Sequence, residues 1–212
     1  LELARVDEAK LRKVTTPCID DHHLPITDFE EKGQLHAEAS KIVLKILYVA
    51  RLCRCDLLWS VNDLARRVTK WTLACDKRLH RLVSYMHTTV EYVQVNFMGD
   101  VPKDCTLALF CDASFAGDVT DSKSTSGAIL CLVGPNSFVV LDWFCKKQGA
   151  VSHSSSEAEI LSLDAALRMM GLPMLNLWDQ VIDIYHGLFG PAFTTPWRQP
   201  QVHDIDWVPT TQ

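Results

Sequence analysis

Three short apolar runs in the second half of the chain are separated by residues that favour turns. The first covers residues 107–111, ends at Asp112, and has the length and composition of a buried strand. The second covers residues 128–133, and the third, rich in aromatic and β-branched side chains, covers residues 138–145. Ser, Gly, Thr and Asp fill the first connection, and a Gly-Pro pair breaks the second. The pattern predicts three strands in a meander, with Asp112 at a strand tip.

A helix start follows the third run. Ser154 and Glu157 have the spacing of a capping box, in which each side chain accepts a hydrogen bond from a backbone amide near the other. Ser156 with Glu159 offers an alternative register for the same cap. Residues 155–170 are apolar on nearly every helical face, and this predicts a buried helix.

Two carboxylates in this region are candidates for a metal site. Glu159 lies one turn into the predicted helix among apolar neighbours, where an ionised carboxylate without a cation is costly. Together with Asp112 at a strand tip, it predicts a site for Mg²⁺, with Mn²⁺ as an alternative ion, because Mg²⁺ prefers carboxylate and water oxygens. The competing interpretation is that Asp112 caps a turn and Glu159 faces solvent.

The first half of the chain has helical periodicity. Apolar residues recur at three- and four-residue intervals over residues 34–50, and similar patterns predict helices over 57–68 and 73–88. Residues 90–97 then alternate at every second position, which predicts a strand. Residues 1–33 hold prolines and aspartates with little periodicity, and we expect a mobile segment or the remnant of a preceding domain.

Positive charge is concentrated in these predicted helices. Between Lys41 and Arg81 there are ten lysines and arginines against three aspartates, a local net charge of +7 in a chain whose total is −5. Such a cluster can hold a phosphate backbone, although a solvated helix face would also account for it. The predicted nucleic-acid contacts are Arg51, Arg54, Arg66, Arg67, Lys70, Lys77, Arg78 and Arg81.

The eight cysteines are scattered, several of them inside apolar runs, where a free thiol behaves as a small hydrophobe. The nearest zinc-like pattern, His22-His23 with Cys53-x-Cys55, lacks the usual two-residue spacer. We therefore expect neither disulfides nor a zinc site.

The sequence shows neither a membrane-spanning run nor a signal peptide. No run approaches 18 apolar residues, so we expect no membrane partner, and the charged N-terminal residues do not resemble a signal peptide. The expected location is intracellular rather than secreted. The chain begins without Met, and this favours an internal piece of a longer protein.

Four motifs occur in one order in the second half. They are Asp-Ala-x-x-Ala-Gly-Asp at 112–118, Lys-Ser-Thr-Ser-Gly at 123–127, Lys-Lys-Gln at 146–148 and Ser-Ser-x-Glu-Ala-Glu at 154–159. In this order they resemble the ribonuclease H domain of copia-type retrotransposon polyproteins.

The resemblance implies a chemistry and a setting. It places the family's first catalytic Asp on Asp112 and its catalytic Glu on Glu159, and implies two-metal hydrolysis of the RNA strand in an RNA–DNA hybrid. It also implies the rest of a Pol polyprotein as partner, and a location in cytoplasmic virus-like particles or the nucleus. Residues 39–92 are similar to the family's region between the reverse transcriptase palm and the ribonuclease H, and the residues that match its pattern lie at 47–66. The polymerase motif Tyr-x-Asp-Asp does not occur, so we expect no polymerase activity.

The family's third catalytic Asp is not found. Residues 175–185 favour a helix over the strand that should carry it, and Asp183 is the one candidate third acid at a plausible distance. We expect a chain that ends before this Asp, or an unrelated tail, and therefore weak or no cleavage. The alternative function is that of a non-catalytic, nucleic-acid-binding remnant of a Pol polyprotein.

The expected fold class is α/β (α+β), with a helical connection region followed by an incomplete, ribonuclease H-like mixed sheet and its buried helix. The expected division has four parts. These are an irregular N-terminal segment, the helical connection region, the partial ribonuclease H-like domain and an irregular C-terminal tail, at residues 1–33, 34–99, 100–171 and 172–212.

Overall fold

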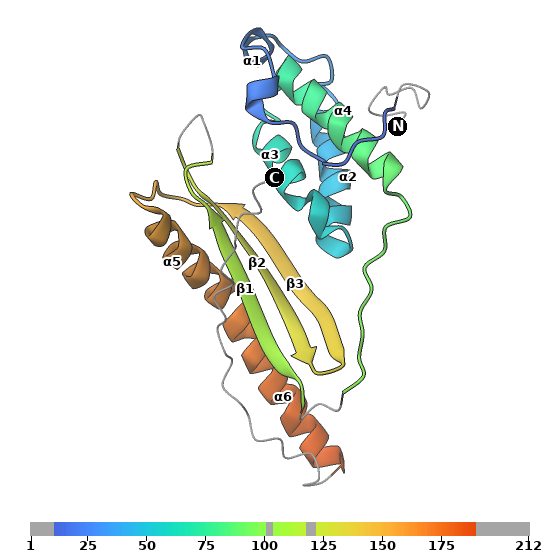
Figure 1. Ribbon diagram of the computed structural model, residues 1–212, viewed down its shortest axis with the longest axis vertical. Helices are drawn as coiled ribbons and strands as arrows, with labels where there is room; N and C mark the ends of the chain where they lie inside the picture. The colour runs from blue at the N-terminus through green and yellow to red at the C-terminus, as the bar shows by residue number, and fades with distance from the viewer. Residues whose placement is uncertain (1–10, 101–103, 118–121, 190–212) are drawn as a thin grey trace. The chain divides into compact units, whose positions relative to one another are not determined.

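The chain forms two compact units, Leu1–Gln94 and Val95–Gln212. The structure is a computed structural model and describes residues 11–100, 104–117 and 122–189. Figure 1 shows helices in the first unit, and a sheet with a long helix in the second. This combination of helices with an antiparallel sheet confirms the predicted mixed fold class.

Three helices make the core of the first unit, and their bounds are α2 (Ala39–Leu52), α3 (Leu58–Arg66) and α4 (Leu73–Thr88). The predicted third helix is confirmed at both ends, and the second lies within its predicted range. The first begins five residues later than predicted. Residues 34–38 form turns instead, because the Asp76 carboxylate of α4 accepts hydrogen bonds from the backbone amides of Gln34 and Leu35.

The described part of the N-terminal segment contains the 3-10 turn η3 (Asp21–His23) and the short helix α1 (Thr27–Glu30). A further 3-10 turn, η4 (Cys55–Leu57), leads into α3. A single β-bridge joins Lys32 to Thr72 beside the start of α4. These contacts give the irregular residues before α2 a defined place on α4.

The predicted strand over residues 90–97 is wrong. Residues 92–96 are exposed on both faces and belong to no strand, and Phe97 forms only an isolated bridge with Phe138. An alternating pattern needs a neighbouring strand to form a ladder, and here the pairing stops at that one bridge and a hydrogen bond from the Val140 amide to the Asn96 side chain.

Three antiparallel strands form the sheet of the second unit, in the order β1-β2-β3. Their bounds are β1 (Thr106–Ser114), β2 (Thr125–Gly134) and β3 (Ser137–Lys147), and the predicted meander is confirmed. Each strand extends beyond its apolar run, because backbone pairing continues where the side chains become polar. A bulge interrupts the β2–β3 register between Leu130 and Cys131.

One face of the sheet is covered by consecutive helical elements: α5 (Ser155–Ala166), the π-helical turn η6 (Leu167–Gly171) and α6 (Leu172–Phe189). Ala128 and Leu130 of β2 pack with Ala166 and Met170 in the core of this layer. The predicted capping box is confirmed. The Ser154 Oγ accepts a hydrogen bond from the Glu157 amide at 3.1 Å, and the Glu157 carboxylate accepts one from the His153 amide at 2.6 Å.

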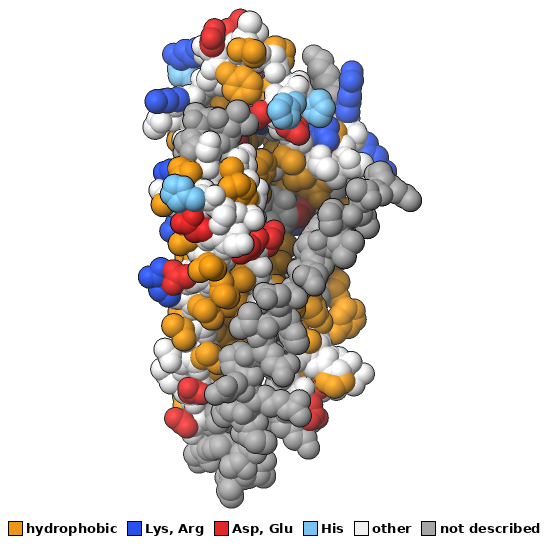
Figure 2. All heavy atoms as spheres, turned by 60° about the vertical axis from the view of Figure 1, so that its left-hand side comes forward, with side chains coloured by type: hydrophobic (Ala, Val, Ile, Leu, Met, Phe, Trp, Pro, Cys, Tyr) orange, Lys and Arg blue, Asp and Glu red, His pale blue; other side chains and the backbone are white. Residues whose placement is uncertain are grey.

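The prediction that this helix is buried on nearly every face is wrong. Ile160, Met169 and Leu172 are 66%, 48% and 52% exposed. The sheet covers one side of the helix, and among the described residues no second layer covers the other. Figure 2, turned to bring this side forward, shows hydrophobic side chains at the surface.

By length and composition alone, the helical stretch Ser155–Gln180 could cross a membrane. Core helices of soluble proteins meet the same criterion. Here the stretch packs on the sheet through Ala166 and Met170, and carries an ion pair between Arg168 and Asp164. The expectation that the chain has no membrane partner stays a prediction.

The cap gives a direct test of the helix start. Ser154→Ala removes the acceptor for the Glu157 amide and should lower the free energy of unfolding by about 1 kcal/mol. Urea unfolding followed by circular dichroism measures the loss. Ser156→Ala is the matched control, since it removes a hydroxyl from the same turn without touching the observed cap. Equal losses in the two variants would contradict the assignment of the cap.

Candidate functional site

Asp112 lies within β1, not at its tip. The strand continues to Ser114, and Asp112 pairs with Gly127 of β2. Its neighbour Cys111 packs against the core between sheet and helix. Because side chains alternate along a strand, Asp112 points to the other face of the sheet, where it is exposed.

Glu159 lies in the second turn of α5 and is exposed. The argument that it needs a cation because it is buried is therefore wrong. The prediction failed because the apolar side chains next to it in sequence, such as Ile160, themselves face outward. Its role in metal binding stays a prediction that rests on the motif.

Ser162, one turn after Glu159, fastens α5 to the sheet at Asp112. Its side chain is completely buried, and its Oγ donates to the Asp112 carbonyl oxygen at 2.7 Å. The Gly127 carbonyl oxygen lies 3.5 Å away. The helix turn that carries Glu159 is thus fixed to the segment of β1 that carries Asp112. Sequence reasoning missed Ser162, although a serine within an apolar helix was a signal for a buried polar contact.

Gln148, the last residue of the Lys-Lys-Gln motif, makes a second polar link. Its buried Nε2 donates to the Ser126 Oγ at 3.0 Å and to the Ala158 carbonyl at 2.9 Å. Its Oε1 accepts a hydrogen bond from the Ser152 hydroxyl at 2.9 Å. The backbone amide of Gln148 donates to the Ser124 carbonyl oxygen at 2.8 Å. One side chain therefore connects three of the four motifs.

The described residues do not complete a metal site. No group of three or more His, Cys, Asp or Glu side chains gathers anywhere among them. Asp183, on α6, belongs to no such group. Two carboxylates alone would fill only part of the coordination shell of one Mg²⁺ ion, and this donor set does not fit two ions.

Three of the predicted nucleic-acid contacts converge on one buried carboxylate. Arg66, Arg67 and Arg78 lie 3.0, 3.1 and 3.3 Å from the Asp63 oxygens. Asp63 and Arg78 are both more than nine-tenths buried. Arg78 therefore has a structural role in the unit, while Arg66 stays more than one-third exposed.

Three cations of α4 bind the N-terminal segment. Lys77 lies 2.5 Å from Asp28, Arg78 pairs with Asp21, and Arg81 donates to the Thr16 carbonyl and hydroxyl at 2.9 and 2.8 Å. Of the other three predicted contacts, Arg51 and Lys70 are exposed, and Arg54 has partners inside the unit. The structure thus divides the predicted basic cluster into cations with intramolecular partners and cations that face solvent.

Arg54 joins the start of η4 to the end of α4. It donates to both carboxylate oxygens of Asp56 at 2.9 and 2.7 Å, and to the Thr89 carbonyl and hydroxyl at 3.1 and 2.7 Å. Its guanidinium lies 5.9 and 5.7 Å from the ring centres of Tyr85 and Tyr92. The hydrogen bond with Asp56 raises the pKa of Arg54, which is held inside the unit.

None of the eight cysteines forms a disulfide, and all of them lie in the described residues. Burial raises the pKa of the Cys55 and Cys131 thiols, which favours their neutral form.

The amino-acid sequence is similar to three known proteins. The chain is 29% identical over 161 residues to a retrovirus-related Pol polyprotein from transposon RE1 of Arabidopsis thaliana, a match covering 76% of this chain and 10% of the polyprotein. It is 31% identical over 121 residues to the secreted RxLR effector protein 161 of Plasmopara viticola, covering 57% of this chain and 80% of that protein. These relatives support the identification of the chain as a fragment of a copia-type retrotransposon Pol polyprotein.

At 161 residues, the Pol match is longer than either unit and therefore includes parts of both. A third relative, an uncharacterized mitochondrial protein of Arabidopsis thaliana, is 29% identical over 124 residues, 57% of this chain and 48% of its own length. The matches thus span about half of the mitochondrial protein and a tenth of the polyprotein. No protein-family model matches the chain. No solved structure matches it either.

The Ser162 link can be tested by stability. Ser162→Ala leaves the Asp112 carbonyl without its buried donor and should destabilise the sheet unit by about 1 to 2 kcal/mol. Urea unfolding measures the change, with the exposed Ser155→Ala as control. An unchanged midpoint for Ser162→Ala would contradict a stabilising link between α5 and β1.

The Arg54–Asp56 pair predicts a pH dependence. Burial opposes ionisation of Asp56, but the hydrogen bond and charge of Arg54 outweigh it, so the pKa of Asp56 is lowered in the folded state. Its stabilising contribution is present above the unfolded pKa of about 4 and is lost as pH falls through the lower folded pKa.

Asp56→Asn should therefore lower the free energy of unfolding at pH 7 by up to about 1 kcal/mol, a modest value because the carboxylate is partly exposed. The difference from the unsubstituted chain should shrink below about pH 4. Urea unfolding across this pH range measures it, with the exposed Asp104→Asn as control. A difference that is constant with pH would rule out the ion pair as its source.

Proposed function

We propose that this segment of a copia-type Pol polyprotein contains a ribonuclease H-type unit that acts on RNA–DNA hybrids. In this proposal, Asp112 and Glu159 are the metal-binding carboxylates. The observation that carries the proposal is the 2.7 Å hydrogen bond from Ser162 to the Asp112 carbonyl. It fixes the Glu159-bearing turn to the Asp112-bearing strand, and these are the two positions that the family motif marks.

The motif residues around this bond support the same proposal. Gln148 links the Lys-Ser-Thr-Ser-Gly segment of β2 to the first turn of α5 through Ser126 and Ala158. Residues far apart in the sequence are therefore held together by buried polar contacts. Such contacts are more specific than apolar packing, because a buried polar group needs its partner.

The metal would be Mg²⁺, or Mn²⁺ in its place, with the hybrid's phosphate oxygens completing its shell. Bound there, it would activate a water and stabilise the leaving oxygen. With two carboxylates and no third acid beside them in the described residues, we expect this chain to cleave weakly or not at all. Selectivity for the hybrid would come from groove shape and 2′-hydroxyl contacts.

A second candidate function is nucleic-acid binding without cleavage, by the helical unit. The observation that favours it is the sharing of one Asp63 carboxylate by Arg66, Arg67 and Arg78, which leaves an excess of positive charge on this surface. An intracellular location, in cytoplasmic particles or the nucleus, belongs to the same proposal.

Cleavage of a labelled RNA–DNA hybrid by the full chain in Mg²⁺ tests the nuclease proposal. We expect the unsubstituted chain to cleave the hybrid slowly or not detectably. Where it is detectable, Asp112→Asn and Glu159→Gln should each remove it, because each takes away a metal ligand, while hybrid binding stays unchanged.

The matched control is Glu157→Gln, which alters the neighbouring glutamate of the motif but only at the cap. Cleavage that survives both Asp112→Asn and Glu159→Gln would refute the assignment of these residues. If no cleavage occurs, Mg²⁺ titration followed by thermal unfolding decides. Stabilisation by Mg²⁺ that Asp112→Asn removes supports the site, and no stabilisation favours the non-catalytic alternative.

A further inference from the structure

Residues 16–28, which we name the acidic strap, lie across the basic side chains of α4. Three cations of α4 each bind a residue of the strap, and they are Lys77, Arg78 and Arg81. Their partners are Asp28, Asp21 and Thr16. The strap therefore occupies, within the same molecule, cations that the sequence marks as candidates for binding phosphate.

The ion pairs differ in how much solvent they meet. Asp28 is 4% exposed, whereas its partner Lys77 has a side chain that is 44% exposed. Arg78 is buried between Asp21 and Asp63 and also lies 5.6 Å from the ring centre of Phe29. The strap thus covers Arg78 fully, but leaves Lys77 at the rim of the contact.

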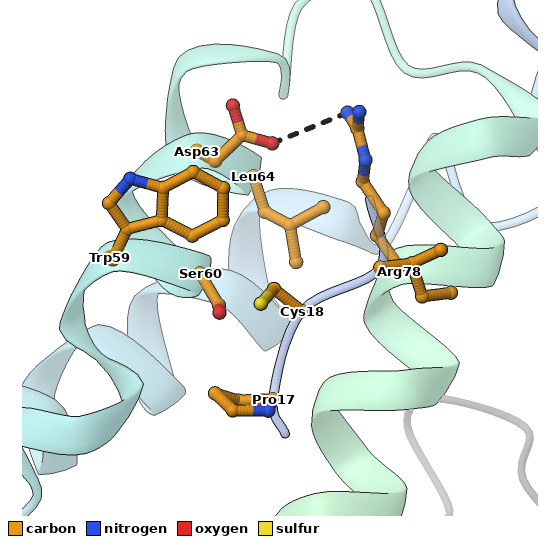
Figure 3. A pocket seen from close by; sticks show the side chains of 8 residues that line it. Pro17, Cys18, Trp59, Ser60, Asp63, Leu64 and Arg78 are labelled. Carbon is orange, nitrogen blue, oxygen red and sulfur yellow. Dashed lines mark hydrogen bonds and ion pairs between the residues drawn. The ribbon is translucent and has the colours of Figure 1, made fainter. Parts of the chain in front are cut away.

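The fit between the strap and α3 is imperfect. A cavity of about 10 Å³, roughly the space of one water, lies between them. Strap residues Pro17 and Cys18 line one side of it, and Trp59 and Ser60 of α3 line the other (Figure 3). No group of the described residues pairs with the Ser60 Oγ, which is buried beside this space for one water.

The strap is held on α4 by ion pairs and hydrogen bonds. An anion that binds the same cations can compete with these contacts, and this makes the strap suited to exchange.

Charge decides what could take the place of the strap. When its carboxylates leave, Arg66, Arg67 and Arg78 still share Asp63, while Lys77 and Arg81 lose the strap partners named above. Guanidinium groups bind phosphate as they bind carboxylate, often through two hydrogen bonds. A nucleic-acid backbone presents such anions in series.

We propose that the basic face of α4 is a nucleic-acid backbone-binding surface, and that the acidic strap covers it until nucleic acid displaces the strap. This inference is independent of the nuclease proposal, because it needs neither Asp112 nor Glu159.

The first test removes the charges of the strap. Asp21→Asn/Asp28→Asn in the full chain should bind a fluorescein-labelled RNA–DNA hybrid several-fold more tightly than the unsubstituted chain at low salt. The slope of the logarithm of the association constant against the logarithm of the salt concentration should become more negative by about 1 to 2, because one or two additional phosphates are contacted. Both proteins carry Asp112→Asn so that cleavage does not interfere.

The matched control is Glu30→Gln/Glu31→Gln. It removes the same charge from the exposed residues just after the strap, without altering a partner of α4. We expect a much smaller change in affinity. Adding Lys77→Gln/Arg81→Gln to the strap variant should cancel its gain. A gain that survives this addition, or unchanged binding by a folded strap variant, overturns the proposal.

A second test uses the unsubstituted strap and so does not depend on how the variants fold. Saturation with the hybrid should increase hydrogen exchange at the amides of Asp28, Phe29 and Glu31, which are hydrogen-bonded within and beside the strap. Unchanged exchange at saturation overturns displacement. If polyglutamate releases the strap and the hybrid does not, the surface is one for acidic protein segments, and the nucleic-acid proposal is wrong.

Discussion

The buried carboxylate of Asp63 is the constraint on which the helical unit depends. A charge this deep in the unit is tolerated only with close partners, and Arg78 supplies one from α4 while Arg66 and Arg67 supply others from the end of α3. These contacts fix how α3 and α4 meet. They also leave more positive than negative charge in one place, and the acidic strap, through Asp21, meets part of that excess.

The sheet unit is organised by a different kind of contact. Its core, around Leu130, Ala166 and Met170, is small, and apolar contacts have no preferred direction, so they fix the position of a helix on a sheet less closely than hydrogen bonds do. Ser162 and Gln148 restrict such sliding, because each has to meet particular backbone or hydroxyl groups. The four motifs thus include a residue, Gln148, whose buried side chain fixes the position of its neighbours.

Local patterns predicted the local structure well, and long-range contacts account for the failures. The helix Leu73–Thr88, the three-stranded meander and the Ser154 cap follow from neighbours in sequence, and all were predicted. Charge counting could not show that Lys77 and Arg78 bind aspartates 49 and 57 residues earlier in the chain. Apolar periodicity likewise could not show that nothing in the described residues covers the outer face of α5, and this is why Glu159 is exposed rather than buried.

The geometry of β1 limits where a third metal ligand could come from. Cys111 faces the helical layer, so Asp112 faces the opposite side of the sheet. Met170 and Met174 pack in the helical layer, which places the start of α6 on the side away from the Asp112 carboxylate. Asp183 continues along that helix, and α5 with Glu159 covers the same face of the sheet. Either acid could therefore share an ion with Asp112 only around the outer edge of β1, which pairs with no strand among the described residues. Any other partner for Asp112 would have to approach from the face of the sheet that the described helices leave open.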